Sequence, residues 1–233
     1  MCAHIPYFFN NLKGPTKMNM KLLQVTPLPG ANKNRLGEVS VLLDKLERKF
    51  IDIAPWSKYP DKPKVSFTMA HANDHIFIKY DVEEYEVLAR YKNINDPVYK
   101  DSCVEFFIGF DDEKSYYNIE FNRLGTCLGR FGTDRENRTE LPVEILKTIK
   151  YERTLLKKTD PNDLSINWTL TVAVPIKVFC FHHLNSFKHQ QAKMNFFKCG
   201  DDLSQPHYLV WNNIISDIPN FHLPEFFGEV EFM

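Results

Sequence analysis

The sequence has no excess of charge of either sign, no cysteine pair at metal-binding spacing and no long apolar run. Its 233 residues include 29 lysines and arginines against 30 aspartates and glutamates, a formal net charge of -1, and the basic residues are spread along the chain. Proteins that bind nucleic acid or anionic lipid concentrate basic residues in a patch. We therefore expect neither nucleic acid nor a membrane as a partner, and a neutral ligand fits better.

The cysteines are few and isolated. Their number is odd, their spacing is wide, and no two form a CxxC pair, which argues against a zinc site or a disulfide framework. We expect most of them to be buried free thiols in a fold that needs neither metal nor disulfide. The five are Cys2, Cys103, Cys127, Cys180 and Cys199.

Apolar segments are short throughout. None approaches the roughly 18 residues that a membrane-spanning helix requires. The opening segment MCAHIPYFFNNLKGP lacks the basic start, the apolar centre and the small-residue cleavage site of a signal peptide. We expect a soluble protein that is not exported and is cytoplasmic by default. Met18 or Met20 is an alternative start, because MNMKLLQV reads better as a beginning, and neither version carries a signal peptide.

What the chain does contain is material for a large core. Hydrophobic residues make up 43% of it and aromatic residues 14%, and a chain of this length can bury roughly 75% of its unfolded surface. No internal repeat, linker or low-complexity tract divides the sequence. The composition predicts a single domain over residues 1–233, in which 1–37 form an irregular N-terminal segment.

Local patterns predict many short strands and few helices. Apolar residues at helical spacing predict a helix over 39–50, and Pro175 can open a short second helix over 176–181. Residues 93–97 and 134–142 read as loops. The whole pattern predicts an all-β protein, an antiparallel β-sandwich of jelly-roll type with one or two short helices. Segments rich in β-branched and aromatic residues predict strands over 65–72, 75–83, 86–92, 103–110, 116–122, 125–132, 149–156, 164–175, 193–200, 206–214 and 227–232.

The segment from Tyr99 to Thr126 places carboxylate, amide and aromatic side chains beside one another. Side chains two residues apart share a face of a strand, and the short charged connection 111–115 predicts an antiparallel hairpin that brings the Glu105 and Glu120 faces together. The apolar faces hold Val104, Phe106 and Ile108 in the first run and Tyr117, Ile119 and Phe121 in the second, whereas Tyr116, Asn118, Glu120 and Asn122 share the opposite face of the second run.

The order of four segments resembles the family 9 carbohydrate-binding modules, a xylanase-associated group related to DOMON domains. The segments are DSCVEFFIGF, YYNIEFNRLGT, INWTLTVAVP and the ending HYLVWNNIISDIPNFHLPEFFGEVEF, and the similarity spans Asp52 to Phe232. The strand DSCVEFF and the closing pattern PxFHxPEFFG are its most specific parts.

This resemblance implies a non-catalytic sandwich that holds the terminal sugar of a plant-type, xylan-like or cellulose-like glycan between two aromatic rings. Tyr99, six residues ahead of Glu105, stands at the first aromatic position, where the family has tryptophan, and Trp211 stands at the second. A family amide or carboxylate falls at or near Glu120. Both Arg123 and Arg130 compete for the family arginine. Where relatives bind calcium the ion is structural, so the resemblance allows structural calcium here, and it implies a module that acts alone or with a separate glycoside hydrolase.

Sugar chemistry favours the same residues. A pyranose ring packs its C–H face on aromatic planes, and its hydroxyl rim needs acceptors and amide donors. The ligand we expect is therefore an oligosaccharide or polysaccharide. The predicted carbohydrate-binding residues are Tyr99, Glu105, Asn118, Glu120, Asn122, Arg123 and Trp211.

Each of these residues also has a structural alternative. Trp211 alternates with Leu209 and could lie in the core. Glu105 could pair with Arg90 or Arg123, and the two asparagines could satisfy backbone groups in turns. If Tyr99 and Trp211 prove buried, a sandwich that binds other proteins is favoured.

Two further functions remain open at this stage. The pair Glu105 and Glu120 could act as a glycoside hydrolase, which needs two carboxyl groups about 5 to 9 Å apart. A haem-binding DOMON-like sandwich would need a histidine and a methionine in one pocket, such as His71 with Met69. The remaining histidines, at 182, 183, 207 and 222, have no spacing that converges on a metal.

Overall fold

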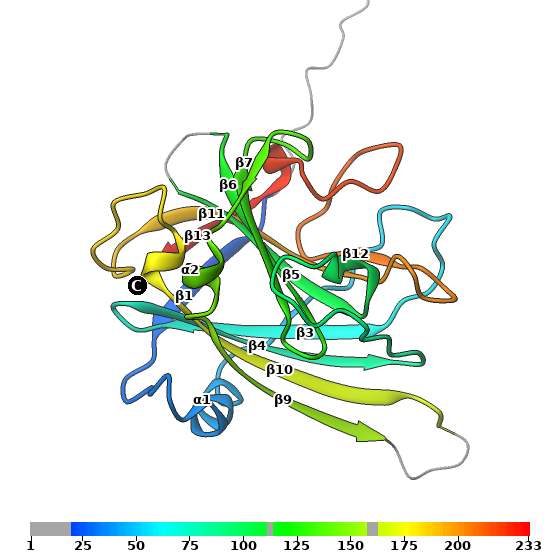
Figure 1. Cartoon of the computed structure of the whole chain (residues 1–233), viewed down its shortest axis with the longest axis horizontal. Coiled ribbons are helices and arrows are strands. Elements are labelled where there is room, and N and C mark those ends of the chain that lie inside the picture. The colour runs from blue at the N-terminus through cyan, green and yellow to red at the C-terminus, as the bar shows by residue number, and fades with distance from the viewer. Residues whose placement is uncertain (1–19, 111–113, 158–162) are drawn as a thin grey trace, which may run out of the picture.

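The strands of the computed structural model form one continuous sheet that curls into two facing layers (Figure 1). The structure describes residues 20–110, 114–157 and 163–233, and thirteen strands lie in this part of the chain. The first layer runs in the order β8 (Arg138–Glu140), β7 (Cys127–Gly132), β6 (Tyr116–Asn122), β5 (Cys103–Phe110), β11 (Gln191–Cys199) and β13 (Gly228–Phe232). The second runs in the order β3 (Lys64–His71), β4 (His75–Glu84), β10 (Ile166–Pro175) and β9 (Lys150–Lys157). The all-β sandwich is confirmed.

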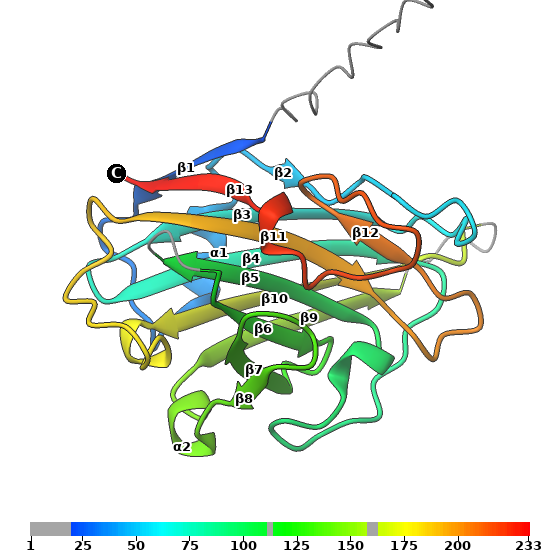
Figure 2. The same ribbon diagram turned by 90° about the horizontal axis from the view of Figure 1, so that it is seen from above.

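One strand, β1 (Leu22–Pro27), joins the two layers. Its first four residues pair in parallel with β13, and Thr26 and Pro27 pair in parallel with β3. Figure 2 shows β1 and β13 side by side along one edge of the molecule. The prediction of an irregular segment over 1–37 is therefore wrong for Leu22–Pro27, where Leu23 and Val25 alternate into the core, and from Leu36, where a helix begins. Residues 1–19 lie outside the described part of the chain.

The core fills the space between the layers. Phe67 of β3 stacks on Phe196 of β11, with ring centroids 3.7 Å apart. The predicted apolar faces of the central hairpin, including Phe106 and Ile119, lie in this core, so the period-two interpretation of both strands is confirmed.

The helix near the front is shorter than predicted. Helix α1 (Leu36–Leu43) packs three buried side chains against the outer face of β4 and β10, and it ends at Asp44. Residues 49–50 instead form β2 (Lys49–Phe50), which pairs with β3. The helical spacing of Phe50 was therefore coincidental, because a turn separates it from the helix, and its side chain is exposed.

The segment 86–92 is a loop rather than a strand. Its backbone N–H groups at Leu88, Arg90 and Tyr91 donate to the side chains of Ser102 and Asp101 instead of to a neighbouring strand. The predicted loop 134–142 contains β8, and the unpredicted α2 (Val143–Leu146) follows it. Short 3₁₀ helices occur at η1 (Val98–Lys100), η2 (Ile176–Val178) and η3 (Pro224–Phe226), and η2 confirms the short helix after Pro175.

A second apolar cluster covers the outer face of the first layer. Phe107 of β5 and Phe197 of β11 pack there against Trp56, Phe221 and Phe227 from the surrounding loops. The short strand β12 (Tyr208–Val210) pairs with β11 at this face. Loops that pack on this cluster surround the polar end of the outer face of the first layer. The candidate site lies there. No described helix is long and apolar enough to cross a membrane.

Candidate functional site

A cavity opens over the outer face of β5, β6, β7 and β11, and the segments that connect the strands surround it. It includes the two glutamates of the predicted hairpin together with aromatic, basic and amide side chains. The residues that line it are Tyr99, Glu105, Glu120, Leu128, Arg130, Arg135, Arg138, Cys199, Asp201, Tyr208, Pro219, Asn220, Phe221 and His222.

Glu105 and Glu120 form the floor of the cavity. The antiparallel register of β5 and β6 places them directly opposite each other, as the sequence predicts, and their exposed fractions are only 2% and 4%. Burial raises the pKa of Glu105 well above its usual value, and the neighbouring charge of Glu120 raises it further. Burial raises the pKa of Glu120 to about 7, partly offset by Arg138 and by a hydrogen bond from Asn118. Near neutral pH, the Glu105 carboxyl group is therefore protonated and the Glu120 carboxyl group is close to half ionised.

A chain of hydrogen bonds holds Glu120 in place. Asn118 Nδ2 donates to Glu120 Oε1 at 2.7 Å, and Arg138 Nη1 donates to Asn118 Oδ1 at 3.2 Å. Asn118 is fully buried behind the cavity wall, so it orients its two neighbours rather than lining the cavity. The second carboxyl oxygen, Glu120 Oε2, is buried and has no hydrogen-bond partner within the described part of the chain.

Aromatic side chains flank the polar floor. Tyr99, the predicted first stacking residue, lines the cavity. Tyr208 and Phe221 line it as well, with ring centroids 6.1 Å apart, and Tyr59 packs edge-on behind Tyr208 at 4.8 Å. The Tyr208 hydroxyl donates a hydrogen bond to the carboxylate of Asp201, which orients both groups.

Trp211 does not reach the cavity. Its side chain is 2% exposed and lies between the layers, edge-on to Phe67 and Phe196 at 6.1 and 5.8 Å. The alternation of Leu209 and Trp211 toward the interior explains this position, and Tyr208 points to the opposite face of the strand. The prediction of Trp211 as a stacking residue is corrected, and the structural alternative describes it.

Asn122 and Arg123 also lie outside the cavity lining. Asn122 stabilises the turn after β6, because Oδ1 accepts hydrogen bonds from the backbone of Leu124 and Thr126 and Nδ2 donates to Asp101 and to the Tyr91 carbonyl oxygen. Of the two competing arginines, Arg130 lines the cavity and Arg123 does not.

Most of the basic side chains that line the cavity were not predicted from the sequence. Arg130 faces Asn118 across the β6–β7 register, so the period of two could have placed it beside Glu120. Arg135 and Arg138 come from the segment read as a polar loop, where no periodicity indicates direction. Arg130 also forms an ion pair with Glu140, N to O at 3.2 Å.

His222 comes from the closing motif of the resemblance, but that motif alone gave it no role. Burial lowers the pKa of His222 to about 2, and Arg138 and Arg135 lower it further, so the imidazole is neutral. Its Nδ1 atom is 3.0 Å from the Tyr116 hydroxyl, and its ring packs on Phe107. The cavity therefore contains a neutral histidine that can donate or accept a hydrogen bond.

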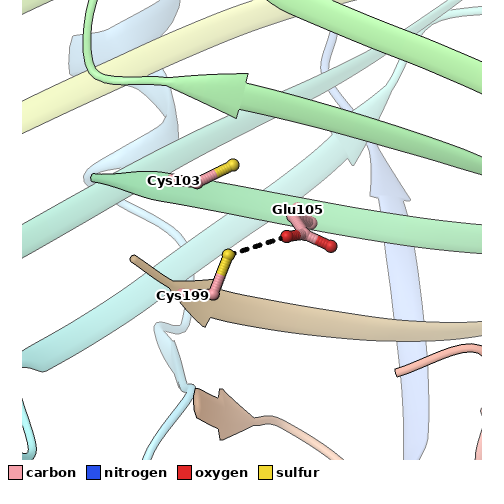
Figure 3. Close-up of side chains that lie close together, drawn as sticks. All are labelled: Cys103, Glu105 and Cys199. Carbon is pink, nitrogen blue, oxygen red and sulfur yellow. Dashed lines mark hydrogen bonds between the residues drawn. The ribbon is translucent and has the colours of Figure 1, made fainter. Parts of the chain in front are cut away.

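Two sets of side chains concern the possible binding of a metal ion or of haem. Among the described residues, Cys103, Glu105 and Cys199 form a group with ligand atoms close enough together to hold a metal ion (Figure 3). His71, the candidate haem ligand, has its ring nitrogens 3.2 and 2.9 Å from the carbonyl oxygens of Ala72 and Met233. A histidine bound in this way is not free to ligate iron, so the haem alternative has no support.

Comparison with known proteins agrees with this fold. The model of carbohydrate-binding family 9 matches residues 38–232, and the chain belongs to this family. A crystal structure of a candidate carbohydrate-binding protein from Bacteroides uniformis ATCC 8492 is similar at 33% identity, with a TM-score of 0.82 over 92% of this chain and 100% of that chain.

More distant structures share the fold. A family 9 module from Caldicellulosiruptor kristjanssonii in complex with glucose has 14% identity and a TM-score of 0.58, over 91% of this chain and 96% of that chain. The corresponding complex with cellotriose has 13% identity and a TM-score of 0.58, over 91% and 93% of the two chains. A search of curated proteins found no match.

Proposed function

We propose that the cavity binds the terminal sugar of an oligosaccharide or polysaccharide without cleaving it. Membership of carbohydrate-binding family 9 gives the class of function, non-catalytic carbohydrate binding. The Glu120 Oε2 atom, which has no hydrogen-bond partner among the described residues, carries the assignment to this cavity. A buried acceptor without a partner costs about 1–3 kcal/mol, and a sugar hydroxyl would offset that cost by donating to it.

Aromatic side chains that line the cavity would supply the apolar contacts to the sugar. Tyr99 and Tyr208 line the cavity from segments far apart in the sequence, and each ring can pack against the C–H face of a pyranose. Tyr208 takes the stacking role that the sequence assigned to Trp211. Asn220, Arg135 and Arg138 add hydrogen-bond donors around the rim.

The charge of the cavity favours a neutral glycan. Three arginines and three acidic side chains line it, and Arg130 is also paired with Glu140, so neither sign is in large excess even with the Glu105 carboxyl group protonated. Glucose and cellotriose occupy the modules of similar fold, which supports a cellulose-like or xylan-like ligand here. The partner that we propose is a separate glycoside hydrolase, which would cleave the glycan that this protein holds.

Calorimetry with a panel of cello- and xylo-oligosaccharides and their monosaccharides tests the proposal. We expect binding that weakens by about 3- to 10-fold in Tyr208→Ala and in Tyr99→Ala, because each loses one stacking contact. The matched control is Tyr85→Ala, because Tyr85 is 75% exposed and is absent from the cavity lining. Product analysis of each mixture accompanies the titrations.

Three outcomes separate the alternatives. Binding without cleavage that is lost in the cavity variants and kept in the control supports the proposed site. Equal binding by all variants would place the sugar elsewhere. Shorter sugars released by the wild type and not by Glu105→Gln or Glu120→Gln would replace the proposal with glycoside hydrolysis.

A further inference from the structure

Two cysteines that are 96 positions apart in the sequence lie directly opposite each other in the sheet. The antiparallel register of β5 and β11 pairs Cys103 with Cys199. Glu105 lies two residues beyond Cys103, so its side chain emerges on the same face. Figure 3 shows the three side chains close together, with the Cys199 sulfur pointing toward the Glu105 carboxyl group.

The ligand atoms are close and shielded. The two Sγ atoms and a carboxyl oxygen all lie within 4.8 Å of one another, and the Cys199 thiol donates to Glu105 Oε1 at 3.0 Å. The residues are between 0% and 2% exposed. Tetrahedral zinc has Zn–S bonds of about 2.3 Å and Zn–O bonds of about 2.0–2.2 Å, which place neighbouring ligand atoms about 3.5–4 Å apart. The observed separations are therefore compatible with one cation after small side-chain rotations.

The donor set indicates the kind of cation. Two sulfur atoms select a borderline-soft metal such as zinc, whereas calcium and magnesium take oxygen ligands. We propose that Cys103, Glu105 and Cys199 bind a zinc-class divalent cation at the floor of the cavity.

One coordination position would face the cavity. Glu105 and Cys199 both line it, which gives an entry path for the ion and room for a fourth ligand from solvent. Loading replaces the protons of both thiols and of the Glu105 carboxyl group, if present, with the cation, and these protons leave to solvent. Arg138 lines the same cavity and interacts electrostatically with Glu105, so its positive charge offsets part of the excess negative charge of two thiolates and one carboxylate, whereas Lys198 Nζ is already paired with Glu84 at 2.8 Å.

Cobalt(II) is the first probe, because it replaces zinc and reports its ligands by absorption. The experiment uses the full chain, stripped of metal and kept reduced. We expect a thiolate-to-cobalt charge-transfer band and the intense d–d bands of a tetrahedral site, at one cobalt per chain, and displacement of cobalt by zinc. Zinc affinity then follows from competition with a chelator of known affinity.

The variants identify the ligands. Cys103→Ser and Cys199→Ser change one atom each, and Glu105→Gln keeps the side-chain shape. Each should lower zinc affinity by at least about 100-fold, since changes to outer-shell partners alone cost about 10- to 100-fold. Cys127→Ser is the matched control, because Cys127 is also a buried thiol of the first layer, on β7, but lies outside the cluster. Circular dichroism and thermal unfolding check that every variant is folded.

The results decide the proposal without any sugar measurement. Loss of the charge-transfer band in the two cluster variants, with the band kept in Cys127→Ser, supports it. A reduced wild type that binds no cobalt, or zinc affinity equal in wild type and the cluster variants, overturns it. Neither outcome affects the assignment of the cavity to carbohydrate, which has its own test.

Discussion

Glu105 and Glu120 face each other across neighbouring strands, and both carboxyl groups are buried on the outer face of the first layer. Such a pair is costly to ionise, because each charge disfavours the other and water is largely excluded. The Asn118 amide and the Arg138 guanidinium offset part of that cost at Glu120. The arrangement suits a site that presents hydrogen-bonding oxygen atoms to an uncharged ligand.

The first prediction concerns Glu120→Gln. The pKa of Glu120 is about 7 in the fold against 4.5 as its ordinary value. Between these values the folded state keeps a proton that the unfolded state has released, so stability falls as pH rises through this window. The variant removes this titration, and its side-chain oxygen can still accept from Asn118. We expect it to be more stable than the wild type by ~1–3 kcal/mol at about pH 8 and similar at about pH 4.5.

Urea denaturation at the two pH values measures this difference, and calorimetry should show weaker sugar binding by the same variant. Glu144→Gln is the control, because the Glu144 side chain is 82% exposed. A stability difference that is the same at both pH values would contradict the prediction.

The second prediction separates Trp211 from the sugar site. Trp211→Ala would leave a void beside the stacked rings of Phe67 and Phe196 and should cost ~3–5 kcal/mol of unfolding free energy. The milder Trp211→Phe should lose less stability and should keep the sugar affinity of the wild type, because Trp211 lies outside the cavity lining. Chemical denaturation and calorimetry on the same samples measure both quantities. A folded Trp211→Phe protein that no longer binds sugar would contradict the prediction and would show that Trp211 belongs to the sugar site.

The third prediction concerns the buried histidine His207. Lys198 Nζ donates to its Nε2 atom at 2.7 Å, and Asp61 lies 3.0 Å from its Nδ1 atom, which describes a neutral ring that donates through Nδ1. Burial lowers the pKa of His207 to about 2, with Lys198 as the next cause. Below the ordinary value of 6.5 the unfolded state gains a proton that the folded state excludes. Stability is therefore lost as pH falls through this window, by up to about 1.4 kcal/mol per pH unit for this group.

Replacing His207 with glutamine should flatten that loss. Urea midpoints between about pH 7.5 and pH 5 measure the slope for wild type and variant. His183→Gln is the comparison, since His183 is exposed and should leave the slope unchanged. Parallel slopes for wild type and His207→Gln would mean that the ring is charged in the fold.

The fourth prediction concerns the turn between β6 and β7. Gly125 has a φ of +84°, and a Cβ atom there would lie 2.4 Å from the ring of Tyr151. Gly125→Ala should therefore destabilise the fold by ~1–2 kcal/mol from the backbone alone. Gly30→Ala is a matched control with a similar φ of +80° and open space around it. Thermal unfolding of both variants should show the larger loss of stability for Gly125→Ala. Equal losses of stability would mean that the clash with Tyr151 does not contribute.

The sequence predicts the floor of the cavity better than its walls. Glu105 and Glu120 were placed together by the period of two and a short connection, both of which are local properties. The same alternation allowed Trp211 in the core as one of two alternatives, and only the packing of the layers decides between them. Arg135 and His222 enter the cavity from loops with no repeating geometry, so their direction depends on contacts distant in the sequence.

The group of Cys103 and Cys199 likewise could not be predicted from local sequence patterns. Their spacing argued against a metal site, because that argument assumes ligands brought together by a local motif. Cys103 and Cys199 meet instead through the pairing of β5 with β11, which no local spacing indicates. A cluster built across strands is visible only once the register is known.

The parallel pairing of β1 with β13 has a mechanical consequence. Four residue pairs, from Leu22 with Glu229 to Val25 with Phe232, connect the first and last strands of the fold. Because the strands run in the same direction, a force pulling Leu22 away from Phe232 acts along the strands and loads these hydrogen bonds together in shear. The sandwich should therefore resist stretching between its first and last strands far better than a hairpin that opens one pair at a time.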